Sequence, residues 1–560
     1  MPETEDPTKK WLQPENQPQK YERLFTDIDV GRIKIPKFQR DFVWTNEQTA
    51  KLIDSIIKGF PIGSFILWQT RDELRHIKNI GNITLPDVPK GEPAMYVLDG
   101  QQRITSLYAV RKGVRLTREG VEIDYKRIFI DLSYDPDADE QVVVADDAPQ
   151  NQHITVFDLL NGSFADLADR FSSTELRNRV DDYRRRLTGY DFSTIIIRDY
   201  PIEIAVEVFT RINTGGTPLT LFEIMVAKTY DEQRKFDLLR EYERLLNTED
   251  EKDLDDVGYA TISDTTVLQC IAAQINKQVR AKDILKLDKN AAIDSWPTVK
   301  KAIFTVVDYL RTELRVPVSK LLPYDAMLVP LTYFFIRKEG RAPSTFQNVL
   351  LSQYFWWVAL SNRFSSAAET KIAQDILRMD DILAERAPGY AGEEVRLTMD
   401  DLRWRGFRAN DAFCKGILCL YAFHEPKSFK TNGVIVLDNR WLRTSTAKNY
   451  HHFFPKAYLE KQGVDEDKAN SVLNITLVDD YLNKRDIGAK SPSTYMGSFS
   501  RRNKKIAETM KTHLIDDLDR FGVWENDYFT FIEKRGERVL SELQSRLNPA
   551  EIASGAKATD

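Results

Sequence analysis

The sequence predicts an α/β (α+β) protein of several domains. Its 560 residues exceed the ~100–200 residues of a typical domain, and 42% of them are hydrophobic, which is enough for large cores. Short β-rich runs alternate with helical patterns in the first part of the chain, whereas long amphipathic segments dominate the middle. These observations favour three domains, at residues 15–230, 231–425 and 426–550.

The first predicted domain combines strands with helices. Residues 64–68, 94–98 and 193–197 are rich in strand-forming side chains. Residues 47–58 place their apolar side chains at helical spacing and predict an amphipathic helix. The acidic stretch 135–150 contains proline and is predicted to be a surface loop.

The middle domain is predicted to be α-helical, because residues 296–314, 320–337 and 346–364 are long amphipathic segments with few strand signals. The sequence shows no repeat of fixed period, so a solenoid is not supported. A further helix is expected at 533–547, near the end of the third domain.

Charge is distributed unevenly along the chain. The formal net charge is −6, with 79 Lys and Arg against 85 Asp and Glu, yet residues 427–511 contain 16 basic and 9 acidic side chains. One basic segment in an acidic chain is typical of a protein in which a single module faces nucleic acid. A solvated lysine-rich face would give the same balance.

The composition favours a cytoplasmic protein. The first residues, MPETEDPTKKW, are polar and show no secretory signal. The most apolar run, residues 354–360, is far shorter than the ~18–20 residues of a membrane span. Three cysteines are too few for a disulfide framework. Cys414 and Cys419 lie in an apolar helical run, which favours a packed pair over a zinc half-site.

Residues 97–107 are predicted to form a strand that ends at Asp99-Gly100 and opens directly into a helix. Such a turn exposes backbone N–H groups at the positive end of the helix dipole, where anions bind. Arg103 would add a bidentate phosphate donor, and Asp99 could hold a divalent cation that bridges phosphate oxygens. The alternative is a plain turn whose arginine forms a surface ion pair.

This stretch and three others, at residues 35–44, 60–64 and 209–219, resemble the N-terminal domain of the GmrSD family of modification-dependent (type IV) restriction proteins. The resemblance covers about residues 20–230 and depends on Asp-Gly-Gln-Gln-Arg with the upstream Phe-Gln-Arg-Asp-Phe-Val-Trp. It implies a ParB/sulfiredoxin-like fold that binds and hydrolyses an NTP (GTP, ATP, UTP or CTP) with Mg²⁺. The implied nucleotide-binding residues are Gln39, Arg40, Asp99, Gly100, Gln101, Gln102, Arg103, Arg211 and Asn213. No Walker lysine loop occurs, so a P-loop NTPase is not predicted.

A second group of candidate residues lies in the basic segment, where His451 and His452 precede Asn474 and Asn483. Phosphodiester hydrolysis needs a base that activates water and a metal that stabilises charge on the phosphate. Histidine can serve as the base at neutral pH, and amide oxygens are ligands of hard cations. The alternative is that the histidines are packed and the asparagines cap turns.

The series His-His-x-x-Pro, Asn-x-Thr-Leu and Leu-Asn resembles the HNH (ββα-metal) nuclease module of the same family. It implies that His452 is the general base, that Asn474 orients the base and holds the loop, and that His451 and Asn483 bind a divalent metal. His451 stands where the family has Asp or Glu, so a softer ion becomes an alternative to Mg²⁺ or Mn²⁺, and activity could be reduced. Contacts to the DNA backbone are expected from Lys484, Lys490, Arg501, Arg502, Lys504 and Lys505.

The two resemblances together predict an NTP-regulated, metal-dependent DNA endonuclease or nickase in antiphage defence, directed at modified double-stranded DNA. Two alternatives stay open: an NTP-dependent DNA-binding regulatory protein with a degenerate HNH site, and an RNA-directed nuclease. The sequence does not decide the DNA modification, the NTP, or whether the protein forms a homo-oligomer.

Overall fold

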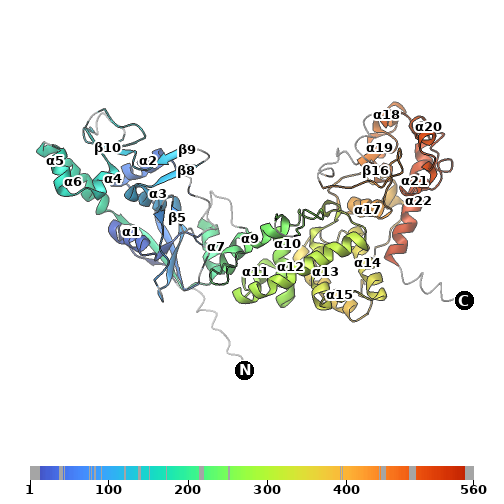
Figure 1. The fold of residues 1–560 in the computed structure, drawn as a ribbon, viewed down its shortest axis with the longest axis horizontal. Helices are drawn as coiled ribbons and strands as arrows, with labels where there is room; N and C mark the ends of the chain where they lie inside the picture. The colour runs from blue at the N-terminus through green and yellow to red at the C-terminus, as the bar shows by residue number, and fades with distance from the viewer. Residues whose placement is uncertain are drawn as a thin grey trace, which may run out of the picture. The chain divides into compact units, whose positions relative to one another are not determined.

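The computed structural model contains two compact units, residues 1–238 and 239–560 (Figure 1). The structure describes residues 13–36, 42, 44–72, 74, 76, 79–80, 83–89, 91–118, 121–135, 141–150, 152–171, 173–212, 220–249, 252–390, 393, 395–439, 442, 450–478 and 487–548. Strands and helices mix in the first unit and helices prevail in the second, which confirms the mixed α/β class. The three predicted domain ranges stay predictions, and the predicted border between residues 425 and 426 lies inside the second unit.

A mixed five-stranded sheet, in the order β1-β14-β4-β7-β3, forms the framework of the first unit. Its strands are β1 (Glu15–Asn16), β3 (Ile33–Lys34), β4 (Phe65–Thr70), β7 (Ala94–Asp99) and β14 (Thr194–Arg198). β4 pairs antiparallel with β7 and parallel with β14. These central strands confirm the three strand predictions, and inward side chains such as Phe65, Leu67 and Val97 are fully buried.

Helices cover the framework of the first unit. The helix predicted at 47–58 is confirmed as α2 (Asn46–Ile57), which begins with a capping box between Thr45 and Gln48. Its apolar side chains, including Leu52 and Ile53, are buried. The other helices that the structure describes in this unit are α1 (Tyr21–Asp29), α3 (Gln101–Lys112), α4 (Val156–Asn161), α5 (Phe164–Arg170), α6 (Thr174–Thr188), α7 (Ile202–Ile212) and α8 (Leu221–Thr229).

The acidic stretch 135–150 contains a strand whose first residue, Val143, is buried, so the prediction of a surface loop is wrong for its middle part. β11 (Val143–Ala145) lies in a three-stranded sheet with β10 (Ile128–Asp131) and β12 (His153–Thr155). The carboxylate of Asp54 on α2 accepts the N–H groups of Val142 and Val143 at 2.7 and 3.2 Å. Consecutive valines bury enough apolar surface to outweigh the acidic side chains around them. Short ribbons join β2 (Gln19–Lys20) to β13 (Asp191–Phe192), β5 (Asn79–Ile80) to β6 (Ile83–Thr84) and β8 (Arg115–Arg118) to β9 (Val121–Asp124).

Most of the second unit is helical. The segments predicted at 296–314, 346–364 and 533–547 are confirmed as α12 (Lys289–Thr312), α14 (Thr345–Leu360) and α22 (Tyr528–Leu547). The segment predicted at 320–337 becomes α-helical only as α13 (Leu328–Lys338). The 3-10 turns η2 (Ser319–Leu321) and η3 (Asp325–Met327) precede it, because Pro323 lies between them and cannot donate a helical hydrogen bond.

The remaining elements of the second unit surround a short hairpin. Its two strands are β15 (Tyr450–His452) and β16 (Ile475–Leu477). The helices are α9 (Leu238–Leu246), α10 (Asp264–Asn276), α11 (Ala281–Leu285), α15 (Ala368–Leu383), α16 (Met399–Arg403), α17 (Ala412–Phe423), α18 (Lys456–Lys461), α19 (Glu466–Ala469), η4 (Val472–Asn474), α20 (Pro492–Arg502) and α21 (Ile506–Lys511). Within the described ranges, no helix combines the length and the apolar character that crossing a bilayer requires.

Cys414 and Cys419 form the packed pair that the sequence predicts. Both lie on α17 and are buried, and their Sγ atoms donate to the backbone oxygens of Gly406 and Leu321. Burial raises the pKa of the Cys419 thiol to about 12, so the thiol stays protonated. These cysteines therefore pack α17 into the core.

Candidate functional site

The strand-to-helix turn at Asp99-Gly100 forms as predicted. β7 ends at Asp99, α3 begins at Gln101, and Gly100 between them has a φ of +88°. This left-handed conformation favours glycine, and a Cβ at Gly100 would lie 2.4 Å from Cδ1 of Phe65. Gly100 therefore turns the chain and lets the N-terminus of α3 approach β4 closely.

The guanidinium of Arg103 is hydrogen-bonded to groups of the first unit. It donates to the backbone oxygens of Ile62 and Ser64 and to Oδ2 of Asp99, the last at 3.0 Å. Gly63 has a φ of +83°, and a Cβ there would lie 2.5 Å from Nη1 of Arg103. Arg103 thus ties the loop before β4 to the Asp-Gly-Gln-Gln-Arg turn, and these are two of the stretches that carry the family resemblance.

The structure brings part of the predicted nucleotide site together. Asp99 to Arg103 lie in one turn, in which the Asp99 carboxylate remains 42% exposed while Gln101 and Gln102 are buried. Arg211 lies on a different helix, α7, where it is exposed and pairs with Glu207. The predicted residues Gln39, Arg40 and Asn213 lie outside the described residues. Nucleotide binding at this turn stays a prediction.

The two adjacent histidines lie in the β15–β16 hairpin of the second unit. β15 runs antiparallel to β16, with His451 opposite Thr476 and His452 opposite Ile475. Successive side chains of a strand point to opposite faces, so the two imidazoles lie on different sides of the hairpin. His451 is buried and His452 is partly exposed.

Asn470, which the sequence analysis did not single out, orients His452. Its Oδ1 lies 3.0 Å from Nε2 of His452, and its Nδ2 donates to the backbone oxygen of Phe407. Because an amide oxygen only accepts, the proton of the neutral imidazole is on Nε2 and Nδ1 is deprotonated. Burial lowers the pKa of His452 to about 4, so the ring is neutral at pH 7. The arrangement presents Nδ1 as a proton acceptor.

Asn474 holds the loop between the two strands, as the sequence predicts for part of its role. Its side chain is fully buried and forms three hydrogen bonds to the backbone. Oδ1 accepts from the N–H of Phe454 at 2.8 Å, and Nδ2 donates to the oxygens of Phe454 and Ala469 at 2.9 and 3.0 Å. The hydrogen bond to His452 comes from Asn470, four residues earlier.

His451 offers an unpartnered nitrogen, but the described residues do not complete a metal site around it. Its Nε2 is buried and has no hydrogen-bond partner among the residues that the structure describes. Burial and the neighbouring His452 and His513 lower its pKa to about 3, so the ring is a neutral potential ligand. Nowhere in the described ranges do three or more His, Cys, Asp or Glu side chains form a group that could hold a metal ion. The other predicted ligand, Asn483, lies outside those ranges.

A buried arginine supports the hairpin from α22. The guanidinium of Arg535 donates to the backbone oxygens of Leu473, Ile475 and His513, and it lies 4.5 Å from the centre of the Tyr421 ring. Burial of Arg535 is complete, and no acidic side chain of the described chain pairs with it. This single side chain therefore satisfies carbonyls from three points of the chain that would otherwise be buried without partners.

Most of the predicted DNA-contacting cations are exposed around the junction of α20 and α21. Four of them form no ion pair with any residue that the structure describes: Arg501, Arg502, Lys504 and Lys505. Asn503, in their midst, is buried and donates to Phe429 and Thr509, which fixes the turn. Tyr495 of α20 donates to the backbone oxygen of Phe453, just after β15. Lys490 precedes α20, and Lys484 lies outside the described residues.

Comparison with known proteins gives two findings. Residues 21–230 match the family model described as the GmrSD restriction endonuclease, N-terminal domain. The whole chain is also similar to an uncharacterized protein of Methanocaldococcus jannaschii, with 24% identity over 588 aligned positions that cover 92% of this chain and 96% of the relative. The first finding supports the family resemblance of the N-terminal region. The assignment of an HNH module to the second unit stays a prediction.

Proposed function

We propose that this protein is an NTP-regulated, metal-dependent DNA endonuclease or nickase that acts in antiphage defence on modified double-stranded DNA. The family match of residues 21–230 supports a restriction-endonuclease type of function. The observation that carries the hydrolytic part is the pair of His452 and Asn470, which leaves Nδ1 of a neutral imidazole as a proton acceptor.

In the proposed reaction, Nδ1 of His452 takes a proton from a water molecule as that water attacks the phosphorus atom. A bond forms between phosphorus and the water oxygen, the bond to one sugar oxygen breaks, and the leaving oxygen gains a proton from solvent. Asn470 keeps the other ring proton on Nε2 and thereby fixes the tautomer. A base with a pKa of about 4 is unprotonated at pH 7 but weak, so the reaction depends on positive charge near the phosphate.

A divalent metal ion would supply that charge by stabilising the phosphate as a Lewis acid. We propose Mg²⁺ or Mn²⁺, or a softer ion because the candidate ligand His451 is an imidazole. The unpartnered Nε2 of His451 supports metal binding on the side of the hairpin opposite to His452, and Asn483 is the second proposed ligand. The exposed cations around Asn503 would hold the DNA backbone through phosphate contacts.

In the first unit, we propose that the turn from Asp99 to Arg103 holds the phosphates of an NTP. The N-terminus of α3 provides a positive helix end, because its N-cap residue Gly100 has no side chain to cap it. The exposed carboxylate of Asp99 would hold a divalent cation, which would supply positive charge to the phosphates, while Arg103 fixes the adjacent loop through the oxygen of Ser64. GTP, ATP, UTP and CTP remain equal candidates.

The central test compares the full-length wild type with His452→Ala on plain, methylated, hydroxymethylated, glucosylated and phosphorothioated DNA. Each reaction contains Mg²⁺ or Mn²⁺, with and without an NTP. We expect cleavage to fall at least about 100-fold in the variant, because general-base catalysis contributes at least that much, while NTP hydrolysis survives. His424→Gln, which changes another histidine of the second unit, should cleave normally. Equal cleavage by wild type and His452→Ala would contradict the assignment.

A second candidate function is an NTP-dependent DNA-binding regulator with a degenerate nuclease site. It is favoured by His451, which stands where the family has an acidic residue. Metal titration separates the two candidates, because a degenerate site would bind DNA but show no metal-dependent cleavage at any NTP concentration. Parallel reactions with RNA test the third reading, an RNA-directed nuclease.

A further inference from the structure

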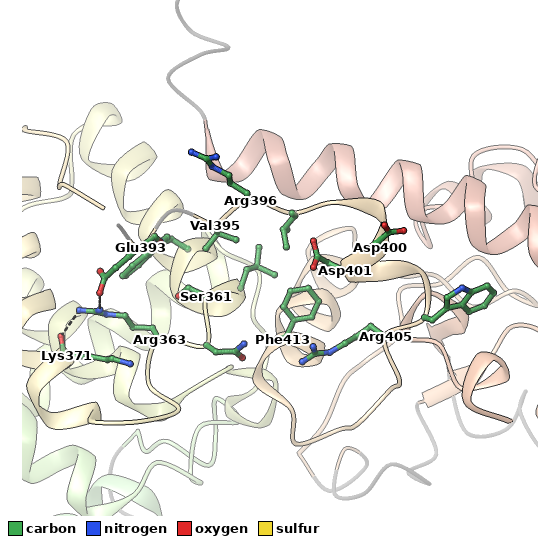
Figure 2. Close-up of a pocket in the computed structure, with 15 residues that line it drawn as sticks. Ser361, Arg363, Lys371, Glu393, Val395, Arg396, Asp400, Asp401, Arg405 and Phe413 are labelled. Atoms are coloured by element: carbon green, nitrogen blue, oxygen red, sulfur yellow. Dashed lines mark hydrogen bonds and ion pairs between the residues drawn. The ribbon is translucent and has the colours of Figure 1, made fainter. Parts of the chain in front are cut away.

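A pocket of about 720 Å³ lies in the second unit, outside the residues assigned to the proposed reaction. Its walls come from the end of α14, from α15, from residues 393 and 395–397, from α16 with the segment after it, and from α17. Figure 2 shows Ser361 between two sides of the pocket, with Lys371 and Glu393 on one side and Asp401 and Arg405 on the other. The volume falls in the ~300–1,000 Å³ range of small-ligand sites.

One end of this pocket presents an exposed aromatic surface. Trp404 is 37% exposed, and its ring centre lies 6.0 Å from that of Phe529, which is 54% exposed. The ammonium of Lys468 lies 5.7 Å from the centre of the Trp404 ring. Exposed aromatic rings beside a cation are the typical surface on which unpaired nucleobases stack.

The pocket lining carries four basic and three acidic side chains: Arg363, Lys371, Arg396 and Arg405 against Glu393, Asp400 and Asp401. Glu393 is neutralised by Arg363 and Arg378, each at 2.6 Å. Lys371 and Arg396, by contrast, form no ion pair with any part of the chain that the structure describes. Two cations without counterions would attract the phosphates on either side of a base.

Hydrogen bonds connect the pocket wall directly to the residue that orients His452. The N–H of Val472 donates to the oxygen of Arg405 at 2.8 Å, and the N–H of Phe407 donates to the oxygen of Asn470 at 2.8 Å. Nδ2 of Asn470 returns a bond to the oxygen of Phe407. Residues 405–407, which follow Trp404, are therefore hydrogen-bonded to Asn470 and Val472, so a ligand that stacks on Trp404 would contact the segment that holds Asn470.

From these observations we propose that the pocket receives an unpaired nucleobase of the DNA, stacked against Trp404. Lys371 and Arg396 contact the flanking phosphates, and Ser361, whose Oγ has no hydrogen-bond partner in the described chain, lies at the wall that the base edge faces. The inference rests on the proposed function only in taking DNA as the partner. It adds that the second unit itself distinguishes a base that has left the duplex from one that is paired.

The test measures binding and needs no cleavage. Full-length His452→Ala is titrated into three DNAs that carry 2-aminopurine: a paired duplex, the same duplex with that base bulged, and the single strand. A fourth titration uses the 2-aminopurine deoxynucleoside monophosphate. We expect the bulged duplex and the single strand to bind about tenfold more tightly than the paired duplex, with a change in 2-aminopurine fluorescence on stacking.

Variants made in the His452→Ala background locate the effect. Trp404→Ala should abolish the tenfold preference and Trp404→Phe should retain most of it, because a phenyl ring still stacks. Phe346→Ala, which removes a 46% exposed ring elsewhere in the second unit, should change nothing. Thermal unfolding midpoints check that the variants are folded. If Trp404→Ala does not fold, the comparison of the wild-type ring with Trp404→Phe still tests the role of the aromatic ring.

Three results would overturn the inference: equal affinity for bulged and paired duplexes, a preference that survives Trp404→Ala in a folded protein, or a free monophosphate that binds as tightly as bulged DNA. The last would make the ligand a free nucleotide. The expected binding pattern without cleavage by the wild type at any metal concentration would leave the pocket inference intact and contradict the proposed nuclease.

Discussion

The turn at Asp99–Arg103 and the β15–β16 hairpin treat their ionisable groups in opposite ways. Arg103 is paired with Asp99 and bonded to backbone oxygens, so its charge is stabilised. His451 is buried and His452 is partly exposed, neither has an acidic partner in the described chain, and their pKa values fall to about 3 and 4. Burial of an imidazole that lacks an acidic partner disfavours its charged form, so both rings are neutral at pH 7. The first arrangement suits the holding of charged ligands, and the second suits the acceptance of a proton.

Of the changes considered, acidification should alter the stability of the protein most. Burial lowers the pKa of His451, His452 and His513 from 6.5 to about 3, 4 and 3. Because the folded-state values lie below the unfolded value, the stability from these groups is complete above pH 6.5 and is lost as pH falls below it. From pH 7 to pH 5 the free energy of unfolding should fall by roughly 4–6 kcal/mol, which urea denaturation would measure.

His513→Asn provides the control for the acid experiment, because an amide can donate to the backbone oxygen of Lys427 in place of Nε2. The variant should lose about one third of this pH dependence. A wild type whose unfolding free energy is the same at pH 7 and pH 5 would contradict the burial of neutral imidazoles.

Asn474→Ala should have the next largest effect and should disrupt the hairpin. It removes three hydrogen bonds and leaves backbone groups of Phe454 and Ala469 buried without partners. We expect the free energy of unfolding to fall by about 3–4 kcal/mol. Asn161→Ala, which removes two exposed bonds to backbone oxygens in the first unit, should cost less than about 1 kcal/mol. Similar losses in the two variants would argue against a special role for Asn474.

Arg103→Lys tests whether the guanidinium stabilises the turn at Asp99–Arg103. A lysine keeps the charge but cannot reach the two backbone oxygens and Asp99 with the geometry of a guanidinium. The free energy of unfolding should fall by about 1–3 kcal/mol, and amide exchange in residues 60–64 should accelerate. The matched change Arg185→Lys, at the exposed ion pair with Asp181, should stay within about 0.5 kcal/mol. Unchanged exchange in that loop would show that Arg103 does not hold it.

The smallest expected effect concerns the exposed cations beside Asn503. Affinity for DNA falls as salt rises, and each phosphate contact contributes ~0.9 to the steepness of log affinity against log salt. The double variant Arg501→Gln, Arg502→Gln should therefore make this dependence less steep by about 2. Arg185→Gln, Arg186→Gln is the control, because those arginines pair with Asp181 and Asp182 along α6. Fluorescence anisotropy at several salt concentrations gives the slopes. Equal slopes in both double variants would remove α20 from the proposed DNA surface.

Local patterns predicted the parts of the fold in which neighbouring residues decide the structure. The strands β4, β7 and β14 and the helix α2 follow from β-branched runs and helical spacing, and the glycine turn before α3 follows from Asp99-Gly100. β11 was missed because its valines stand among acidic residues, and only the contact with Asp54 on α2 shows that they are buried.

The candidate site was less predictable, because burial and partners depend on residues far apart in sequence. The histidine pair and Asn474 were recognisable as a series, yet Asn470 occupies an ordinary polar turn and is marked by no motif. Its role depends on Phe407, 63 residues earlier in the chain. The exposed ring of Trp404 could not be predicted either, because four other tryptophans of the described residues, Trp68, Trp296, Trp356 and Trp357, are buried.

The buried guanidinium of Arg535 has a consequence for the order in which the protein is made. Its partners Leu473 and Ile475 stand 62 and 60 residues before it, so the carbonyls of the hairpin remain unsatisfied until the ribosome has released α22. During synthesis the histidine strand therefore lacks the side chain that completes its interior.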